Sequence, residues 1–430
     1  MKNTSRTIIA VSGVVLLMTA PCGWTQDWPQ WRGANRDAKA TGFTAPKTWP
    51  KELTQKWKAT VGQADATPAL LGDKLYVFAR QGGEEVTRCL DATTGKEVWS
   101  DKYAAQGATG PASGHAGPRS SPTVAEGKVV TLGVRGTLTC FDAAKGKVLW
   151  RKEDFPGAWP KFFTASSPMI TSGLCIAQVG GSGNGGIVAY DLATGDQKWK
   201  WTGDGPAYAS PALMTVDGTK LIVAETEKSI VALNVADGKL AWETPFAAQG
   251  MSYNAATPIV DGQTLIYCGQ GRGAKAVKIE KQGDRFAAKE LWSNPDNSVQ
   301  FNTPVLKNGM LVGMSQRGDF FCINAQDGKT AWTAPSTPPV AGAETAEGGG
   351  VRGGRGGRGR GGFGAVVDAG SVLLALTPAS ELIAFQPSDK AYTELARIKV
   401  ADTATYAYPV VSGKRIFVQD QDSVTLWTFD

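Results

Sequence analysis

Short apolar runs, such as Leu75-Tyr76-Val77-Phe78 and Leu221-Ile222-Val223-Ala224, recur along the chain and are separated by clusters of Gly, Asp, Asn and Pro. Runs of this length between turn residues are typical of β-strands. The pattern therefore predicts an all-β protein whose strands follow one another through short turns.

A hairpin unit follows many of these runs. It consists of a small residue, then Asp or Asn two residues later, then Gly after four more residues and Trp after a further four. The unit runs from Cys89 to Trp99, Cys140 to Trp150, Ala189 to Trp199, Ala232 to Trp242 and Cys322 to Trp332. The Asp or Asn side chain can bond the backbone two residues on, Gly supplies a positive φ, and Trp lies on the return strand. Each unit therefore predicts two strands joined by a tight turn.

A second unit, Ser or Thr followed by Pro, lies upstream of the hairpins and marks the start of a first strand. The prolines are Pro68, Pro122, Pro168, Pro211, Pro258 and Pro304, with Pro409 after Tyr408 as a late variant. The first strand, the apolar run and the two hairpin strands give four strands per repeat, at a spacing of roughly 40 to 50 residues. This is the pattern of a β-propeller blade.

One blade lacks the opening proline, because the interval from Pro304 to Pro409 is about twice as long as the others. We expect this blade at about residues 364–400, with Leu373–Leu376 as its second strand and a degenerate turn before Leu395.

The two ends of the chain predict a closed ring. Trp57 has no preceding strands that could complete a blade, whereas residues 408–427 provide three strands without a fourth. We expect residues 53–60 to pair with the C-terminal strands, which removes two exposed sheet edges. The predicted fold is an eight-bladed β-propeller whose last blade is closed by the N-terminal strand.

Residues 1–26 predict a secretory signal peptide, because basic residues precede an apolar run from Ile8 to Ala20 that is too short to span a bilayer. We expect the mature chain to be exported, to the periplasm or the cell exterior, and to carry no transmembrane segment. A lipid anchor at Cys22 is the alternative, although Pro21 directly before it fits that processing poorly.

Residues 27–52 are an aromatic lead-in interrupted by proline, with Trp28, Trp31 and Trp49. We expect these rings to pack on an exposed part of the propeller and cap it, and stacking on a ligand is the alternative. The propeller itself is expected to occupy residues 53–430.

Residues 341–364 form a Gly- and Arg-rich insert within the propeller. Sequence so poor in apolar residues cannot offset the entropy of ordering, so we expect a disordered loop between blades. Nucleic-acid binding and adhesion to anionic surfaces through the arginines are alternatives. No nucleic-acid partner is expected for an exported chain.

The composition suits a single large ring, with 430 residues and a hydrophobic fraction of 42%. The formal net charge of +6 falls to about +2 once the +2 of residues 1–26 and the +2 of the insert are set aside. Such a balance indicates no strongly polyanionic partner.

The cysteines are expected to be buried core residues. Cys89, Cys140 and Cys322 share one repeat position, and sheets about 10 Å apart exceed the roughly 7 Å limit for a bridged Cα pair. Cys175 and Cys268 lie in second strands. The chain has no Cys-x-x-Cys pair, so neither a thiolate metal site nor haem attachment is indicated.

The repeated Ala/Cys-x-Asp/Asn-x-x-x-Gly-x-x-x-Trp unit resembles the tryptophan-docking motif of the pyrroloquinoline quinone (PQQ) repeat superfamily. The segment from Asp27 to Asp37 is similar to the opening of secreted bacterial PQQ-like propeller proteins. That superfamily contains quinoprotein dehydrogenases as well as cofactor-free scaffolds such as the outer-membrane assembly lipoprotein BamB. The resemblance covers nearly all of the mature chain.

The resemblance implies a binding or assembly module in the cell envelope, with no cofactor and no catalytic or metal-binding residue expected. A dehydrogenase that uses PQQ with Ca²⁺ is the alternative. Quinoprotein alcohol dehydrogenases of this fold hold Ca²⁺ with carboxylate and amide oxygens and carry an adjacent-cysteine disulfide, but this chain has no Cys-Cys pair. Its Asp91, Asp142 and Asp191 already have a structural role in hairpin turns.

In a propeller, the loops between blades and the loops between second and third strands meet on one face around the axis. The second-to-third loops place Arg80, Arg135, Arg272 and Arg317 there. The inter-blade loops add His115, Arg119, Trp159, Lys161, Tyr208, Tyr253 and Asn254. Cations among aromatic rings can hold a small anionic ligand, a quinone or a peptide. We predict that this face binds such a ligand or an envelope protein and that the protein is a monomer; an ordinary solvated rim is the alternative.

Overall fold

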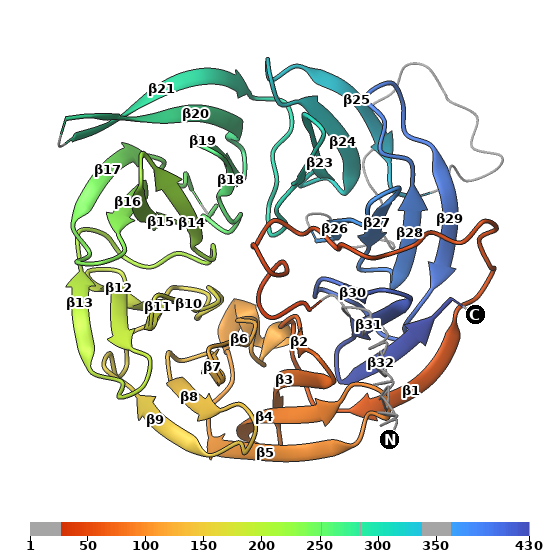
Figure 1. The fold of residues 1–430 in the computed structure, drawn as a ribbon, viewed down its shortest axis with the longest axis horizontal. Helices are drawn as coiled ribbons and strands as arrows, with labels where there is room; N and C mark the ends of the chain where they lie inside the picture. Colours follow the sequence, from red (N-terminus) through yellow and green to blue (C-terminus); the bar gives the residue numbers. More distant parts are fainter. Residues whose placement is uncertain (1–26, 251, 284, 338–362, 430) are drawn as a thin grey trace, which may run out of the picture.

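The computed structural model describes residues 27–250, 252–283, 285–337 and 363–429. Within it, eight four-stranded antiparallel sheets are arranged as blades around a central axis (Figure 1). The all-β, eight-bladed propeller predicted from the sequence is therefore confirmed. The predicted signal peptide, Cys22 and all but the last two residues of the Gly- and Arg-rich insert lie outside the described residues.

Blades 1 to 8 are numbered by the position of their innermost strand in the sequence. Blade 1 consists of β2 (Ala69–Leu71), β3 (Lys74–Gln81), β4 (Glu84–Asp91) and β5 (Glu97–Ala104), and blade 2 of β6 (Thr123–Ala125), β7 (Lys128–Leu132), β8 (Leu138–Asp142) and β9 (Val148–Lys152). Blade 3 consists of β10 (Met169–Thr171), β11 (Leu174–Gly181), β12 (Asn184–Asp191) and β13 (Gln197–Trp201), and blade 4 of β14 (Ala212–Val216), β15 (Thr219–Glu225), β16 (Ser229–Asn234) and β17 (Leu240–Pro245).

Blade 5 consists of β18 (Ile259–Asp261), β19 (Thr264–Gly269), β20 (Gly273–Gln282) and β21 (Arg285–Asn294), and blade 6 of β22 (Val305–Lys307), β23 (Met310–Met314), β24 (Asp319–Asn324) and β25 (Thr330–Pro335). Blade 7 consists of β26 (Ala365–Asp368), β27 (Leu373–Leu376), β28 (Glu381–Phe385) and β29 (Glu394–Lys399), and blade 8 of β30 (Val410–Ser412), β31 (Arg415–Gln419), β32 (Ser423–Thr428) and β1 (Thr54–Thr60). A 3-10 helix, η1 (Gly110–His115), lies between blades 1 and 2.

The sequence markers coincide with the strands. In seven blades the innermost strand begins at the residue directly after the opening proline, as β2 does after Pro68. The blade without an opening proline lies where the spacing predicted it, and its second strand is β27.

The ring is closed by pairing between the two ends of the chain, as predicted. Strand β1 pairs antiparallel with β32, so that Trp57 lies opposite Leu426 and Thr60 opposite Ser423. Blade 8 therefore consists of three C-terminal strands and one N-terminal strand.

A ring of hydroxyl groups joins the innermost strands, and we call it the hydroxyl ring. The Ser121 hydroxyl accepts a hydrogen bond from the backbone amide of Thr67 at 3.0 Å, and the Ser167 hydroxyl accepts one from the amide of Ser121 at 2.9 Å. Equivalent bonds run from the amide of Ser167 to Ser210, from that of Thr257 to Thr303 and from that of Tyr408 to Thr67. Hydroxyl groups that precede the opening prolines therefore tie neighbouring blades together at five places, with Ser121, Ser167, Ser210, Thr303 and Thr67 as the acceptors.

The repeat tryptophans dock against the neighbouring blade. Trp99 packs on Gly146, where a Cβ atom would lie 2.5 Å from the indole, and its Nε1 donates to the carbonyl of Ala143 at 3.0 Å. The same donation to the next blade is made by Trp57, Trp150, Trp199, Trp292 and Trp332. These contacts, and the burial of Trp242 at 9% exposure, give the repeat tryptophans a structural role between the blades.

The cysteines of the described residues, Cys89, Cys140, Cys175, Cys268 and Cys322, are all free and buried, in agreement with the expectation from the sequence. No helix among residues 27–250, 252–283, 285–337 and 363–429 is long and apolar enough to cross a membrane.

The lead-in runs across the axial channel and packs on the inner strands. Two of its arginines are buried there, with Arg32 at 0% and Arg36 at 4% exposure. Arg32 donates to the carbonyls of Thr303 and Pro304 at 2.7 and 2.9 Å. Arg36 donates to the carbonyl of Pro211 at 2.9 Å. The guanidinium groups therefore satisfy backbone carbonyls of several blades at once.

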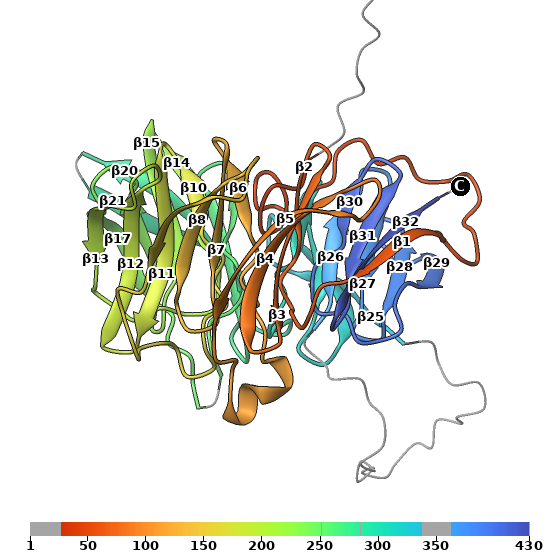
Figure 2. The ribbon, with the colours of Figure 1, turned by 90° about the horizontal axis from the view of Figure 1, so that it is seen from below.

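Other lead-in contacts complete the circuit of the blades. The amide and carbonyl of Trp28 exchange 2.8 Å hydrogen bonds with Leu70 of blade 1. The Pro29 carbonyl accepts a hydrogen bond from the Val124 amide, and the Ala40 amide donates to the Asp368 carbonyl. The side chains of Arg36, Trp31 and Arg32 donate to the Ser167 carbonyl, to Thr257 Oγ1 and to the Tyr408 hydroxyl, respectively. The lead-in thus bonds to the innermost strand, or to the residues just before it, in all eight blades. In Figure 2 it runs over the face of the ring opposite to η1.

Candidate functional site

A pocket of about 380 Å³ lies on the propeller axis. Every inter-blade loop contributes to its wall, and the lead-in contributes Trp31. The lining residues are Trp31, Asp65, Pro111, Ala112, His115, Arg119, Phe162, Ala165, Tyr208, Ser210, Tyr253, Ala255, Phe301, Phe363 and Tyr406. We call this cavity the axial pocket.

The wall of the axial pocket is largely a chain of aromatic rings. Phe301 stacks on Phe363 at a centroid distance of 4.1 Å and on Tyr253 at 5.4 Å. Tyr406 contacts both Phe363 and His115 edge-on at 4.8 Å. The chain continues on the other side of Tyr253 through Tyr208 and Phe162. Ring-to-ring contacts of this kind stabilise one another beyond the area that they bury, so the wall is preformed.

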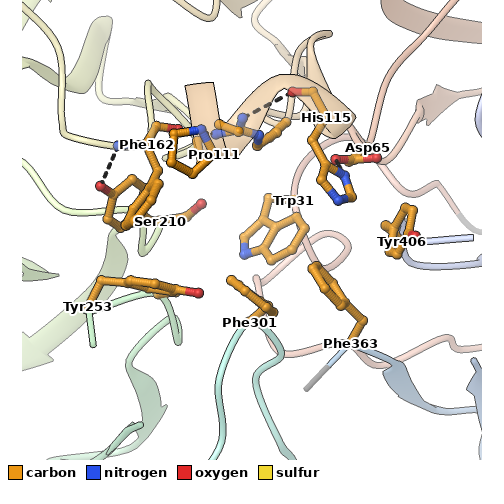
Figure 3. A pocket seen from close by; sticks show the side chains of 15 residues that line it. Trp31, Asp65, Pro111, His115, Phe162, Ser210, Tyr253, Phe301, Phe363 and Tyr406 are labelled. Atoms are coloured by element: carbon orange, nitrogen blue, oxygen red, sulfur yellow. Dashed lines mark hydrogen bonds and ion pairs between the residues drawn. The ribbon is translucent and has the colours of Figure 1, made fainter. Parts of the chain in front are cut away.

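Trp31 lies at the centre of this ring of side chains, as Figure 3 shows. Its Nε1 donates to Thr257 Oγ1 at 2.8 Å, and its ring contacts Tyr408 edge-on at 5.0 Å. Thr257 and Tyr408 each directly precede an opening proline. Thr257 and Tyr408 therefore hold the indole in place while it lines the pocket.

The charged groups of the pocket are already engaged within the protein. His115 Nδ1 and Asp65 Oδ2 lie 2.6 Å apart. Arg119 donates to the carbonyls of Phe162 and of His115, the latter at 3.0 Å. Burial lowers the pKa of Arg119. These contacts tie three inter-blade loops together and give the rim a fixed shape.

The phenol groups are also positioned by hydrogen bonds. The Tyr208 hydroxyl accepts from the backbone amide of Phe162 at 3.0 Å, and burial raises the pKa of Tyr208 to about 12. The Tyr253 hydroxyl accepts from Gln300 Nε2 at 3.1 Å. Both phenols therefore stay neutral at ordinary pH and can donate a hydrogen bond.

Four of the residues predicted from the sequence, His115, Arg119, Tyr208 and Tyr253, line the axial pocket. The others lie elsewhere on the same face and mostly have structural contacts. The Arg135 guanidinium stacks on Trp159 at 4.5 Å and donates to the carbonyl of Gln106 at 3.0 Å.

Arg272 stacks on Phe246 at 3.9 Å and donates to the buried Asn254 at 2.6 Å. The backbone of Arg80 exchanges two hydrogen bonds with Gln63. Lys161 and Arg317 are exposed.

A polar groove opens beside the axial pocket and shares Tyr253 with it. It is lined by Gln249, Ser252, Tyr253, Gln270, Gly271, Arg272, Gln300 and Gln316. We call it the glutamine groove. Gln270 Oε1 is buried and has no hydrogen-bond partner among the described residues.

The binding face predicted from the sequence did not include Trp31, Asp65, Phe162, Phe301, Phe363 or Tyr406, although stacking on a ligand was the alternative given for Trp31. A signal was present for half of them, because the residue three positions before each opening proline lines the pocket. These residues are Asp65, Arg119, Ala165, Tyr208, Ala255, Phe301 and Tyr406. No comparable signal marked Trp31, since its place depends on the path of the lead-in through the channel.

The donor groups of the pocket differ from those that Ca²⁺ requires. Ca²⁺ takes roughly six to eight oxygen ligands, mostly from carboxylates and carbonyls. In the described part of the pocket wall, Asp65 is the one carboxylate, and it is paired with His115. No group of three or more His, Cys, Asp or Glu side chains suited to a metal occurs in the described ranges. These residues do not fit a Ca²⁺-bound tricarboxylate cofactor.

Comparison with known proteins gives the family. Residues 82–334 match the model of the family described as outer membrane protein assembly factor BamB. The chain belongs to this family.

The relatives of this BamB-family chain include outer membrane assembly factors and quinoprotein dehydrogenases. BamB from Burkholderia pseudomallei is 26% identical over 263 residues, which cover 57% of this chain and 60% of the relative. A quinohemoprotein alcohol dehydrogenase from Comamonas testosteroni is 29% identical over 256 residues, which cover 57% of this chain and 34% of the enzyme. The chain therefore spans less than two thirds of the length of these curated relatives.

Solved structures agree on the fold. BamB from Moraxella catarrhalis superposes with a TM-score of 0.59 at 17% identity, covering 88% of the BamB-family chain and 100% of that protein. A europium-containing methanol dehydrogenase superposes with a TM-score of 0.68 at 13% identity, covering 91% of this chain and 89% of the enzyme. At these identities the similarity establishes the propeller fold alone.

Proposed function

We propose that this BamB-family propeller is an exported binding or assembly module of the cell envelope, and that it engages its ligand or partner with the face that carries the axial pocket. The observation that carries the proposal is that all eight inter-blade loops converge on one aromatic-lined cavity of about 380 Å³. Ligand sites are typically preformed, largely apolar cavities of roughly 300 to 1,000 Å³ with a few placed polar groups.

Two further observations support this proposal. The relatives that define the family are named outer membrane protein assembly factors, which favours an envelope setting and a protein partner. The charged groups of the pocket rim are held by backbone carbonyls or by each other, which suits recognition by a rigid surface.

The test is cross-linked capture of envelope proteins by purified wild-type protein and by a double variant, Phe301→Ser with Tyr406→Ser. Both side chains are half-buried on the pocket wall, so the double variant removes aromatic surface from the binding face. Lys145→Ser, in an exposed hairpin turn of the opposite face, is the matched control.

We expect wild type and Lys145→Ser to capture the same proteins and the double variant to lose them, with all three equally folded by circular dichroism. Capture that is indifferent to the double variant contradicts the proposal.

A PQQ-dependent dehydrogenase is the alternative function, favoured by the similarity to a quinohemoprotein alcohol dehydrogenase and by the indole at the centre of the axial pocket. The described donor set argues against it. Titration with PQQ and CaCl₂, followed by cofactor absorbance and by dye-linked alcohol oxidation, decides between the two functions. Saturable cofactor absorbance together with alcohol oxidation would establish the enzyme.

A further inference from the structure

We propose that the axial pocket and the glutamine groove together bind an uncharged oligosaccharide. In this arrangement one sugar unit lies against the indole of Trp31, and the following units lie along the glutamine side chains. The inference rests on the proposed function, because it assigns a ligand class to the same face of the propeller.

The pocket offers ring surface rather than charge. Trp31, Tyr253, Phe301, Phe363 and Tyr406 all contribute to its lining. Each pyranose ring has a face of C–H groups that packs favourably on an aromatic ring, while its hydroxyl groups point outward from the ring edge. A sugar therefore suits a cavity in which aromatic surface dominates and the polar groups stand at the rim.

The indole is prepared for such stacking before any ligand arrives. The bond from Trp31 Nε1 to Thr257 and the edge contact with Tyr408 fix the plane of the ring. A platform that is held in this way loses little side-chain entropy when a ligand packs on it, which favours affinity.

The charges of the pocket do not select a charged ligand. Asp65 and His115 are paired at 2.6 Å, and Arg119 already donates to two backbone carbonyls. The Asp65 carboxylate also lies close enough to Arg119 to offset its positive charge, so the pocket offers a carboxylate or phosphate ligand little net attraction. An uncharged ligand with hydroxyl groups can instead add hydrogen bonds to these side chains.

The glutamine groove supplies the polar recognition that a sugar chain needs. Carboxamide groups are donors and acceptors at once and carry no charge, which matches the dual character of a hydroxyl group. Gln249, Gln270, Gln300 and Gln316 come from loops of blades 4, 5 and 6 and line one groove. The bond from Gln300 to the Tyr253 hydroxyl connects this groove to the pocket wall.

One groove residue independently points to a ligand. Gln270 Oε1 is buried without a hydrogen-bond partner among the described residues. A buried acceptor left without a donor costs about 1 to 3 kcal/mol, so such groups are normally satisfied by the protein, by ordered water or by a ligand. The oxygen is closed off from solvent in this conformation, so a ligand hydroxyl in the groove would provide that donor after the Gln270 carboxamide turns toward the groove.

The test is isothermal titration calorimetry with cellohexaose, maltohexaose and chitohexaose as probes. A proline-rich decapeptide and PQQ with CaCl₂ are titrated alongside, because a peptide would use the same aromatic and amide groups. The variants are Trp31→Ala for the platform and Gln316→Ala for the groove. Gln421→Ala is the matched control, since Gln421 is an exposed glutamine in the loop between β31 and β32 and lies outside the groove.

We expect at least one hexasaccharide to bind. Loss of the indole should weaken binding about tenfold, and loss of the Gln316 amide about three- to tenfold. Gln421→Ala should leave the affinity unchanged. If Trp31→Ala does not fold, Gln316→Ala carries the test, because its side chain lies in the open groove.

The proposal is overturned if no hexasaccharide binds, if saccharide affinity is the same in wild type and Gln316→Ala, or if only the peptide or PQQ binds. Its failure can be told apart from failure of the proposed function. If no saccharide binds but capture of envelope proteins still depends on Phe301 and Tyr406, the binding module stands and its ligand is not a sugar. If neither experiment gives binding, both proposals fall.

Discussion

The backbone amide of Tyr408 donates a hydrogen bond to Thr67 Oγ1 at 2.9 Å, although the two residues lie 341 positions apart. This bond joins blade 8 to blade 1 and belongs to the hydroxyl ring that passes from blade to blade. The ring gives the Ser/Thr-Pro units of the sequence a physical purpose: proline starts the inner strand, and the preceding hydroxyl binds that strand to its neighbour.

Thr67→Val should destabilise the propeller by about 1 to 3 kcal/mol, because the isosteric side chain leaves the buried amide of Tyr408 without an acceptor. Urea unfolding measures the change as a shift of the midpoint. Thr215→Val, at an exposed position of β14, is the control and should have little effect. Equal stability of the two variants would show that the hydroxyl ring does not hold the blades.

Gly146→Ala should destabilise more than Gly127→Ala. Both glycines have nearly the same positive φ, +69° and +71°, so both variants carry the backbone strain of an L-residue in that region. At Gly146 the new Cβ also lies 2.5 Å from the Trp99 indole, whereas nothing lies within 4 Å at Gly127. Overpacking costs about 1 to 3 kcal/mol.

That difference between the two glycine variants is measured by denaturant titration followed through tryptophan fluorescence. If both variants lose the same stability, the docking of Trp99 on Gly146 tolerates a methyl group and does not determine the spacing of the blades.

Cys140→Ala should flatten the alkaline pH dependence of stability. Burial raises the pKa of the Cys140 thiol to about 12, whereas thiols of unfolded chains titrate near about 8.5. The folded state therefore keeps a proton that the unfolded state releases, so this contribution to stability is complete below about pH 8.5 and is lost as pH rises toward 12.

Urea titrations of wild type and Cys140→Ala at pH 7.5, 9, 10 and 11 check this. The variant is less stable at pH 7.5 because it has a cavity, but the gap should narrow by up to about 1.4 kcal/mol per pH unit above pH 9. Parallel stability curves would mean that the thiol does not titrate differently in the two states.

The double charge reversal Arg135→Glu with Arg317→Glu should weaken capture of any ligand or partner that uses the pocket face. Arg135 holds the loop of Trp159 by stacking at 4.5 Å, and Arg317 is an exposed cation on the same face. Binding is compared with that of Lys145→Glu on the opposite face. Unchanged affinity in the double variant would indicate that these arginines are an ordinary solvated rim.

The fold was largely predictable because each blade repeats the same local signals. The Asp-Gly-Trp hairpins and the opening prolines specify strand limits from neighbouring residues alone, and Trp57 without a preceding blade indicated the closure of the ring. Blade 5 departs from this pattern, since β20 and β21 form a long hairpin without the Asp-Gly turn (Figure 1).

The site was predicted only in part, because it is made by long-range contacts. His115, Arg119, Tyr208 and Tyr253 were found by placing cations and aromatic rings in inter-blade loops. Trp31 was not among the predicted site residues, because no local pattern shows that the lead-in crosses the channel.

The lead-in also bears on the order in which the molecule can be assembled. Residues 27–40 precede every blade in the chain, yet they bond to all eight. During synthesis these residues would emerge before any of the blades to which they bond, whereas Tyr408 emerges hundreds of positions later. A truncated or stalled chain would therefore lack inner strands to which residues 27–40 bond. Trp28 and Trp31 would then be open to solvent and the segment to proteases, so that only complete molecules would persist.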